Sequence, residues 1–280
     1  MAKYISNEHI QLLLKLIKKL IEQFYSQNPP PKRPGRPPAY TTEIIILAAI
    51  LKIHKNLSYR TLELILKDKL GHSPDFSTIF YRFKKLNPEL LSFILSKTTQ
   101  ICEKVFDIKE YHTVVADATG FGYDDTVKLN YLRGRQIREV KAHVKTEVLI
   151  GVGGKKKIVL GVAVGKAYSD ELKLLWSILD RAEFKAQHFV ADGYYDSVRL
   201  IKHFEQRQIK CVTPISERTR QEVRNRYRKL VKERYEDERY YRKIYRRSRY
   251  KVEQLFGNVK RAWVIGIIRG YTSLRVCLHW

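Results

Sequence analysis

The sequence has few cysteines, few acidic residues and no long apolar run. Its three cysteines, Cys102, Cys211 and Cys277, lie far apart without a CxxC spacing, so we expect buried thiols rather than a zinc site or a disulfide framework. No stretch reaches the roughly 20 consecutive apolar residues that a membrane span requires. Residues 1–10 lack the charge layout and the apolar run of a signal peptide. These absences predict a cytoplasmic protein.

The shortage of acidic residues gives the chain a large positive charge. Lys and Arg number 54 against 29 Asp and Glu, which gives a formal net charge of +25. At this excess the molecule repels itself unless a polyanion neutralises it, so nucleic acid is the expected partner and the nucleoid the expected location. A basic surface that is merely solvated is the less favoured alternative. With 44% hydrophobic residues, the chain can still build one large core or two modest ones.

The first 40 residues divide into a helix and a linker. An amphipathic pattern over residues 4–25 predicts an N-terminal helix within residues 1–28. Residues 29–40 are rich in proline, which prevents helix and favours an extended backbone. Arg33 and Arg36 of this basic linker are candidates to contact DNA phosphates or to enter a minor groove. A plain basic spacer is an equally good interpretation.

The next segment, residues 41–108, is predicted to be a helical DNA-binding domain of the helix-turn-helix kind. Turn signals separate its helical stretches, which cover residues 41–54, 58–69, 77–86 and 88–106. Ser77 is expected to cap the third helix. That helix interleaves aromatic residues with Arg82, Lys84 and Lys85, as a recognition helix would. An ordinary three-helix bundle with a basic face fits the same spacing equally well.

From residue 109 the apolar pattern changes its period, and strands are expected to alternate with helices. Apolar runs of strand length occur at residues 113–116, 146–152, 157–164, 187–191 and 210–213. Gly153-Gly154-Lys155 predicts a hairpin between the second and third runs. Helices at 169–182 and 195–206 bracket the fourth run, as in crossovers between parallel strands. With a last helix at 250–263, residues 109–280 are expected to form a ribonuclease-H-like α/β core, a mixed sheet flanked by helices.

Residues 216–248 are expected to be an insertion into this core. The segment is crowded with arginine, lysine and tyrosine, and it has few aliphatic residues for a core of its own. Because guanidinium groups bind phosphates and tyrosine rings stack on exposed bases, a helix that lies on DNA is the preferred interpretation. The alternative is a solvated helix with charge pairs between residues four positions apart.

Two aspartates follow strands in the same way, and a glutamate lies on the last helix. Asp117 and Asp192 each come directly after an apolar run that ends in Val-Ala. Sites in open α/β sheets form at the carboxyl ends of strands, although one such aspartate by itself is more often a turn residue. At about 100° per residue, Glu253 shares a helical stripe with Arg249 and Lys260 at the border of the apolar face. A surface pair of Arg249 with Glu253 is the alternative.

These acidic strings resemble those of the bacterial and archaeal insertion-sequence transposases of the IS4 and IS5 groups. The resemblance covers most of the chain. The family's first acid matches Asp117 in VVADATG, the second matches Asp192 in ADGYYDS, and the third matches Glu253 in RYKVEQLFGNVKR. The stretch RPGRPPAYTTEIIILAAIL, followed by LSYRTLELIL, is similar to the helical DNA-binding region of IS5-like enzymes. The resemblance implies a DDE transposase whose catalytic triad is Asp117, Asp192 and Glu253.

The neighbours of the third acid also resemble the family. Arg249 and Lys260 keep the family's spacing around Glu253, and the resemblance implies that both contact phosphate near the cut. The tyrosine expected three residues before Arg249 is replaced by Arg246, and Tyr245 lies one position earlier. The chain stops within an apolar run, whereas family members usually continue through one more apolar helix. A truncated copy is therefore expected.

The resemblance implies metal-dependent chemistry on DNA. Three carboxylates carry enough negative charge for two Mg²⁺ or Mn²⁺ ions about 4 Å apart, which clamp one phosphodiester. Water then cuts at the terminal inverted repeats of the element, and the freed 3′-hydroxyl joins them to target DNA. Paired-end chemistry implies a homodimer on double-stranded DNA. The alternatives are a non-catalytic DNA-binding remnant or regulator and a structure-specific nuclease on the same core.

Overall fold

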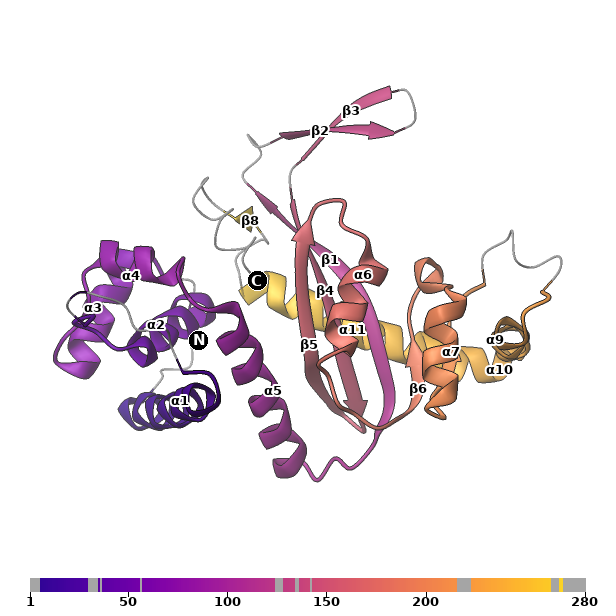
Figure 1. Ribbon diagram of the computed structural model, residues 1–280, viewed down its shortest axis with the longest axis horizontal. Helices are drawn as coiled ribbons and strands as arrows, with labels where there is room; N and C mark the ends of the chain where they lie inside the picture. Colours follow the sequence, from indigo (N-terminus) through magenta and orange to yellow (C-terminus); the bar gives the residue numbers. More distant parts are fainter. Residues whose placement is uncertain are drawn as a thin grey trace. The chain divides into compact units, whose positions relative to one another are not determined.

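The fold is taken from a computed structural model of the chain, which describes residues 6–29, 35, 37–55, 57–123, 128–133, 136–141, 143–215, 223–262 and 267–268. The chain forms two compact units (Figure 1). The N-terminal unit comprises Met1–Lys97 with Val259–Trp280, and the sheet unit comprises Thr98–Asn258. Each unit has its own hydrophobic core.

The N-terminal unit is helical, as predicted. Its helices are α1 (Asn7–Gln27), α2 (Thr42–Lys55), α3 (Tyr59–Leu70), α4 (Phe76–Phe83) and the first half of α5 (Pro88–Val105). Apolar residues three and four positions apart give each helix one buried face, for example Ile10, Ile17 and Ile21 on α1. These faces meet in one core with Leu47 of α2 and Leu62 of α3.

Helix α4 begins one residue earlier than predicted, because a different residue caps it. Asp75 accepts hydrogen bonds from the backbone nitrogens of Ser77 and Thr78, both at 2.9 Å, through its Oδ1 atom. A carboxylate satisfies two free N–H groups of the first turn and also favours the positive end of the helix dipole. The prediction that Ser77 caps this helix is therefore wrong.

The sheet unit contains the five strands that the apolar runs predicted. They are β1 (Tyr111–Tyr123), β4 (His143–Gly153), β5 (Lys156–Lys166), β6 (Ala186–Val190) and β7 (Lys210–Val212). Among the described residues of this unit, these strands lie in the order β5-β4-β1-β6-β7. Figure 1 shows the first four side by side. The pairs β5/β4 and β4/β1 are antiparallel, and the pairs β1/β6 and β6/β7 are parallel. The predicted hairpin and the predicted parallel crossovers are both confirmed.

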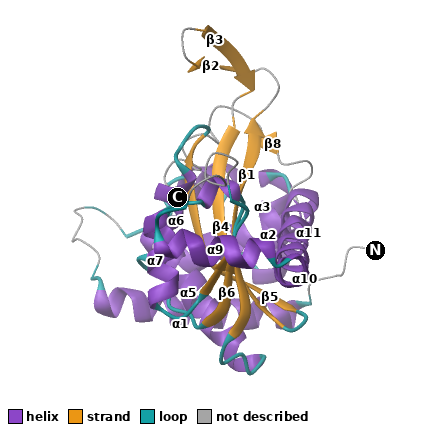
Figure 2. Ribbon diagram, turned by 90° about the vertical axis from the view of Figure 1, so that its right-hand side faces the viewer, coloured by secondary structure: helices purple, strands orange, loops and turns teal. Residues whose placement is uncertain are grey.

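Further strands were not predicted. The strands β2 (Lys128–Arg133) and β3 (Gln136–Lys141) pair with each other in a two-stranded sheet (Figure 2). Their sequences, KLNYLR and QIREVK, mix charged and apolar residues and do not form the apolar runs that a buried strand shows. A short strand, β8, covers Ile267–Ile268.

Helices cover both faces of the main sheet. They are α6 (Glu171–Leu179), α7 (Val198–Gln206), α9 (Arg226–Glu236), α10 (Glu238–Tyr241) and α11 (Arg247–Ala262), with a one-turn 3-10 helix η1 (Gly193–Tyr195) and a π-helical turn η2 (Arg242–Arg246). Side chains alternate along a strand, so Val114 packs with the residues of α6 and α7, whereas Val115 packs with Val252 of α11. The predicted mixed α/β sheet flanked by helices is confirmed (Figure 1).

One face of α9 packs on the sheet unit. Val231 is buried in the core, and Tyr227 and Tyr235 pack against it. Arg228 Nε lies 3.1 Å from Asp196 Oδ1, and Arg234 Nη2 donates to Glu205 Oε2 at 3.0 Å. Two arginines of this basic segment therefore hold α9 to the protein. Residues 216–222 of the predicted insertion lie outside the described residues.

Two of the three cysteines lie in the part of the chain that the structure describes. Cys211 is buried, and burial raises the pKa of its thiol, whereas Cys102 is only half-buried. Cys277 lies outside the described residues. None of the described helices is both long enough and apolar enough to span a membrane.

Candidate functional site

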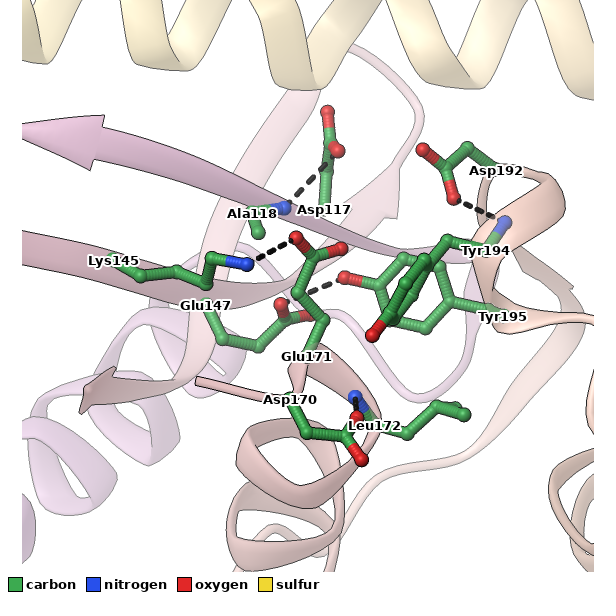
Figure 3. A network of polar contacts seen from close by, with 10 residues as sticks. All are labelled: Asp117, Ala118, Lys145, Glu147, Asp170, Glu171, Leu172, Asp192, Tyr194 and Tyr195. Carbon is green, nitrogen blue, oxygen red and sulfur yellow. Dashed lines mark hydrogen bonds and ion pairs between the residues drawn. The ribbon is translucent and has the colours of Figure 1, made fainter. Parts of the chain in front are cut away.

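The first candidate acid, Asp117, lies inside β1 rather than after its end. The strand continues because Asp117 and the residues that follow it pair with β4, as far as Gly122 opposite His143. The parallel neighbour β6 stops earlier, with Val190 opposite Val115. Asp117 therefore stands where the parallel part of the sheet ends, and its Oδ1 accepts a hydrogen bond from the backbone N–H of Ala118 at 3.0 Å. Its carboxyl points to the face of the sheet that α11 covers (Figure 3).

The second candidate acid, Asp192, follows the carboxyl end of β6. It caps the single turn of η1, with its Oδ1 accepting from the backbone nitrogen of Tyr194 at 2.8 Å. Because β1 and β6 are parallel neighbours, the two aspartates lie near each other at the carboxyl end of the parallel ladder (Figure 3). Burial raises the pKa of Asp117 to about 6, and the charge of Asp192 adds to this rise.

Arg249 of α11 lies between the candidate acids. Its Nη1 atom is 3.9 Å from Asp192 Oδ2, and its Nε atom is 3.6 Å from Glu253 Oε1. Its positive charge also partly offsets the rise in the pKa of Asp117. The side chain of Glu253 is 59% exposed. The surface pair of Glu253 with Arg249 is therefore confirmed, whereas the role of Glu253 as the third acid of the site stays a prediction.

A second group of charged residues lies on the opposite face of the sheet. Glu147 of β4 is fully buried, and its Oε2 accepts from the hydroxyl of Tyr195 at 2.7 Å (Figure 3). Burial raises the pKa of Glu147 to about 8. Nearby, Lys145 Nζ lies 2.8 Å from Glu171 Oε1, at the start of α6. None of these residues was predicted from the sequence. The available signal was a lone acid in the apolar run TEVLIGVG, because glutamate is rarely buried without a partner.

Known proteins resemble this chain in sequence. Residues 109–280, more than half of the chain, match the family described as Transposase DDE domain. The chain belongs to the transposase DDE domain family. An uncharacterized protein of Aquifex aeolicus (strain VF5) is 40% identical over 227 residues, which cover 81% of this chain and 70% of that protein.

Solved transposase structures resemble this DDE domain protein only distantly. The piggyBac transposase, in a synaptic complex with hairpin DNA, matches with 12% identity and a TM-score of 0.33 over 75% of this chain and 50% of that chain. The Mos1 mariner transposase, in a paired-end complex with Mn, matches with 14% identity and a TM-score of 0.24 over 69% of this chain and 65% of that chain. The chain therefore spans half and 65% of the lengths of these two relatives.

Tyr245 of this DDE domain protein contacts Arg249 although it is one position out of register in the sequence. The hydroxyl of Tyr245 accepts a hydrogen bond from Arg249 Nη1 at 3.1 Å. Tyr245 lies in the π-helical turn η2 directly before α11, and a π turn accommodates one extra residue in an α-helix. Tyr245 is four residues before Arg249, and residues three and four positions apart are neighbours on one helix face, so a tyrosine one position early still reaches the arginine. Its ring stacks on Tyr241, with ring centroids 4.7 Å apart.

The two aspartates at this end of the parallel ladder have the chemistry to bind a hard divalent cation. Asp117 and Asp192 offer carboxylate oxygens, which Mg²⁺ and Mn²⁺ prefer, and a bound cation would relieve the repulsion that helps raise the pKa of Asp117. Within the part of the chain that the structure describes, no three His, Cys, Asp or Glu side chains are grouped closely enough to hold a metal ion. Glu253 instead pairs with Arg249.

The structure places the predicted DNA-contacting residues of the DDE domain protein as follows. Arg33 and Arg36 lie outside the described residues, and of Lys260 only the backbone, within α11, is described. The ammonium of Lys84 lies over the ring of Phe80, and that of Lys85 over the ring of Tyr81, at 4.0 and 4.1 Å from the centroids.

Arg82, a further predicted DNA contact, donates from Nη1 to the backbone carbonyl of Tyr40. Burial lowers the pKa of its guanidinium. One of its donors is therefore already used within the protein, and four N–H donors of the guanidinium group are left for other partners at most. The DNA contacts of all these residues stay predictions.

Proposed function

We propose that this protein is a DNA transposase that nicks the ends of its element and joins them to target DNA, with Asp117, Asp192 and Glu253 as its DDE triad. Membership of the transposase DDE domain family supports this proposal. The observation that carries it is the convergence on Arg249, whose guanidinium lies between Asp192 and Glu253 and acts on the charge of Asp117. The proposed group within the family is IS4/IS5, and the proposed core is ribonuclease-H-like.

The three acids are proposed to hold two Mg²⁺ or Mn²⁺ ions. When bound, such ions activate the attacking oxygen and stabilise the leaving oxygen of the phosphodiester. Asp117 lies in a strand that pairs with β4 at its own position and with β6 as far as Val115, so its backbone is held in the sheet. Asp192 is held by its own cap of η1. Glu253 would exchange its pairing with Arg249 for the metal site, which its exposure on α11 allows.

Arg249 and Lys260 are proposed to contact phosphate near the cut. A guanidinium group binds a phosphate through parallel hydrogen bonds, and it offsets negative charge that develops during the reaction. Tyr245 would keep Arg249 oriented, because its hydroxyl accepts one of the guanidinium hydrogens. The neutral hydroxyl is favoured, since burial raises the pKa of Tyr245.

The proposed partner is double-stranded DNA, both the terminal inverted repeats and the target, bound by a homodimer at the nucleoid. The net charge of +25 supports binding to a polyanion. We propose that residues 41–108 form a helix-turn-helix-like domain and that residues 29–40 form a basic linker. The DNA contacts proposed there are those predicted from the sequence, Arg33, Arg36, Arg82, Lys84 and Lys85.

Cleavage of a labelled duplex tests the proposal. The duplex carries the DNA that flanks the coding sequence on each side, and it is incubated with Mg²⁺ or Mn²⁺ or with EDTA. We expect metal-dependent cuts at the element ends, abolished by Asp117→Asn or Asp192→Asn while DNA binding persists. Binding without cutting by the wild type would favour a non-catalytic remnant or regulator. Cutting that ignores the element ends would favour a structure-specific nuclease.

A further inference from the structure

A buried glutamate and a buried tyrosine join two parts of the sheet unit on the face opposite Asp117. Glu147 and Tyr195 are both fully buried, and the hydroxyl of Tyr195 donates to Glu147 Oε2 at 2.7 Å (Figure 3). The other carboxyl oxygen of Glu147, Oε1, accepts no hydrogen bond from any described residue. An acid buried with one oxygen unsatisfied costs free energy, because that oxygen gives up its hydrogen bonds to water. A structural gain or a functional one must offset this cost.

The two residues belong to elements that carry the candidate acids or adjoin them. Glu147 lies opposite Ala118 in the β1/β4 ladder, one residue from Asp117. Tyr195 is the last residue of the η1 turn, which Asp192 caps. The backbone nitrogen of Tyr195 also donates to the backbone oxygen of Asp192 at 3.2 Å. The tyrosine side chain is thus the contact that ties the turn carrying Asp192 to the strand beside Asp117.

We propose that the Glu147–Tyr195 hydrogen bond positions Asp192 relative to Asp117. The bond links η1 to β4 on the face opposite Asp117. It therefore restricts where the η1 turn, and with it the Asp192 carboxylate, can lie. Neither residue touches the reacting groups; both act through Asp192. This inference rests on the proposed metal site, since the separation of the two aspartates matters only if both bind the same ions.

The sheet unit offers a matched control for this bond. The hydroxyl of Tyr111 donates to Glu103 Oε1 at 2.8 Å, and Tyr111 is only 2% exposed. Tyr111 begins β1 and pairs with Ala186 at the start of β6, so this bond lies at the opposite end of the sheet from both aspartates. Tyr111→Phe removes the same chemical group as Tyr195→Phe from a similarly buried site. Any general loss of stability should therefore appear in both variants.

Two measurements on the full chain test the positioning role. The first is hydrogen exchange of the peptide that spans Ala191–Ser197, measured without metal. We expect Tyr195→Phe to speed exchange in this peptide by up to about 10-fold, because it loses the side-chain hydrogen bond that holds η1 to β4. Tyr111→Phe should leave exchange of this peptide at the wild-type rate.

The second measurement is Mn²⁺ affinity, followed by the electron paramagnetic resonance signal of free Mn²⁺. Partners one shell removed from a metal are typically worth about 10–100-fold in affinity, so Tyr195→Phe should weaken Mn²⁺ binding at least about 10-fold. Glu147→Met, which offers no acceptor oxygen, should weaken it to the same extent. Glu147→Gln should restore wild-type affinity, because its amide oxygen can still accept from Tyr195.

The outcomes separate this inference from the proposed function. Wild-type exchange in Tyr195→Phe, or equal Mn²⁺ affinity in Tyr195→Phe and Tyr111→Phe, overturns the positioning role. Fast exchange in Tyr195→Phe supports the link between η1 and β4 even if the wild type binds no Mn²⁺. That last result would overturn the proposed metal site and, with it, the purpose assigned to the link.

Discussion

The acids on the two faces of the sheet differ in their exposure and in their partners, although they lie at the same end of the strands. On the α11 face, Asp117 lies within reach of the charge of Arg249, and Glu253 is 59% exposed. On the α6 and α7 face, Glu147 is fully buried and bonded to Tyr195. Asp117 and Glu147 lie on adjacent rungs of the β1/β4 ladder. Because successive side chains point to opposite faces of the sheet, Asp117 lies on the face with Arg249 and Glu147 is buried in the core of the other face.

This difference teaches that the face of the sheet on which an acid lies decides its chemistry, even for acids on adjacent rungs of the same ladder. An acid that cations can approach keeps the charge that metal binding requires, whereas an acid sealed in the core tends to take up a proton. The same rule appears in the pKa values, which burial raises to about 6 for Asp117 and to about 8 for Glu147. Variants on the two faces should therefore differ in kind, from loss of chemistry to a change in stability.

The largest expected effect is on the exposed acid. Glu253→Gln should reduce metal-dependent cleavage by more than about 100-fold, since even residues one shell removed from a metal are worth about 10–100-fold. DNA affinity, measured by gel shift, should stay at the wild-type value. The matched control is Glu238→Gln, because Glu238 is also exposed and forms the same i,i+4 pair with Arg242. Cleavage by Glu253→Gln at the rate of the control would remove Glu253 from the site.

The next largest effect is expected from Arg249, which lies on the same face. Arg249→Ala should lower cleavage about 100-fold, the size typical for a group that stabilises developing charge. It should not weaken Mn²⁺ binding in the absence of DNA, because it frees both Asp192 and Glu253 from an ion pair. Weaker Mn²⁺ binding by this variant would show that Arg249 assembles the acids rather than competes with metal.

A smaller effect is expected from the tyrosine of the π-helical turn. Tyr245→Phe removes the hydroxyl that accepts from Arg249, so cleavage should fall about 10-fold, as expected for one hydrogen bond to a charged group. Tyr250→Phe is the control, since Tyr250 lies in α11 with 60% of its surface exposed. Equal rates for the two variants would mean that the Tyr245 hydroxyl does not orient Arg249.

The smallest effect is a change in the pH dependence of stability on the sealed face. Burial raises the pKa of Glu147 to about 8, against 4.5 for a glutamate in water, so the folded state holds a proton that the unfolded state releases between these values. Stability should therefore fall as pH rises from about 5 to 8. Glu147→Gln removes this titration, and its Tm should fall less than that of the wild type over the same range. Asp117 keeps part of the slope, because its pKa is also raised. Parallel melting curves would show that Glu147 is ionised in the folded protein.

Much of the framework could be predicted from sequence because it follows from local patterns. Apolar runs specified the five strands of the main sheet, and Gly153-Gly154-Lys155 specified the β4/β5 hairpin, since a tight turn needs glycine at positive φ, here Gly154. Each Val-Ala-Asp string places its aspartate two residues past the last pair of the parallel β1/β6 ladder, Val115 with Val190, although β1 itself continues beyond Asp117. The helical stripe paired Arg249 with Glu253. Each of these signals lies within one element or across one turn.

Long-range packing decided the remaining features. The sequence alone determined that Asp117 and Asp192 follow apolar strand segments and that Glu253 stands one helical turn from Arg249. The tertiary structure decided that Glu147 meets Tyr195, 48 residues away, and that Arg228 and Arg234 of α9 pair with acids 32 and 29 residues away. Apart from Glu147, which lies in an apolar run, nothing local distinguishes these side chains from exposed ones. Their partners come close only when the sheet and its helices pack. Packing also buries these groups, and a buried charge without a partner would cost too much free energy.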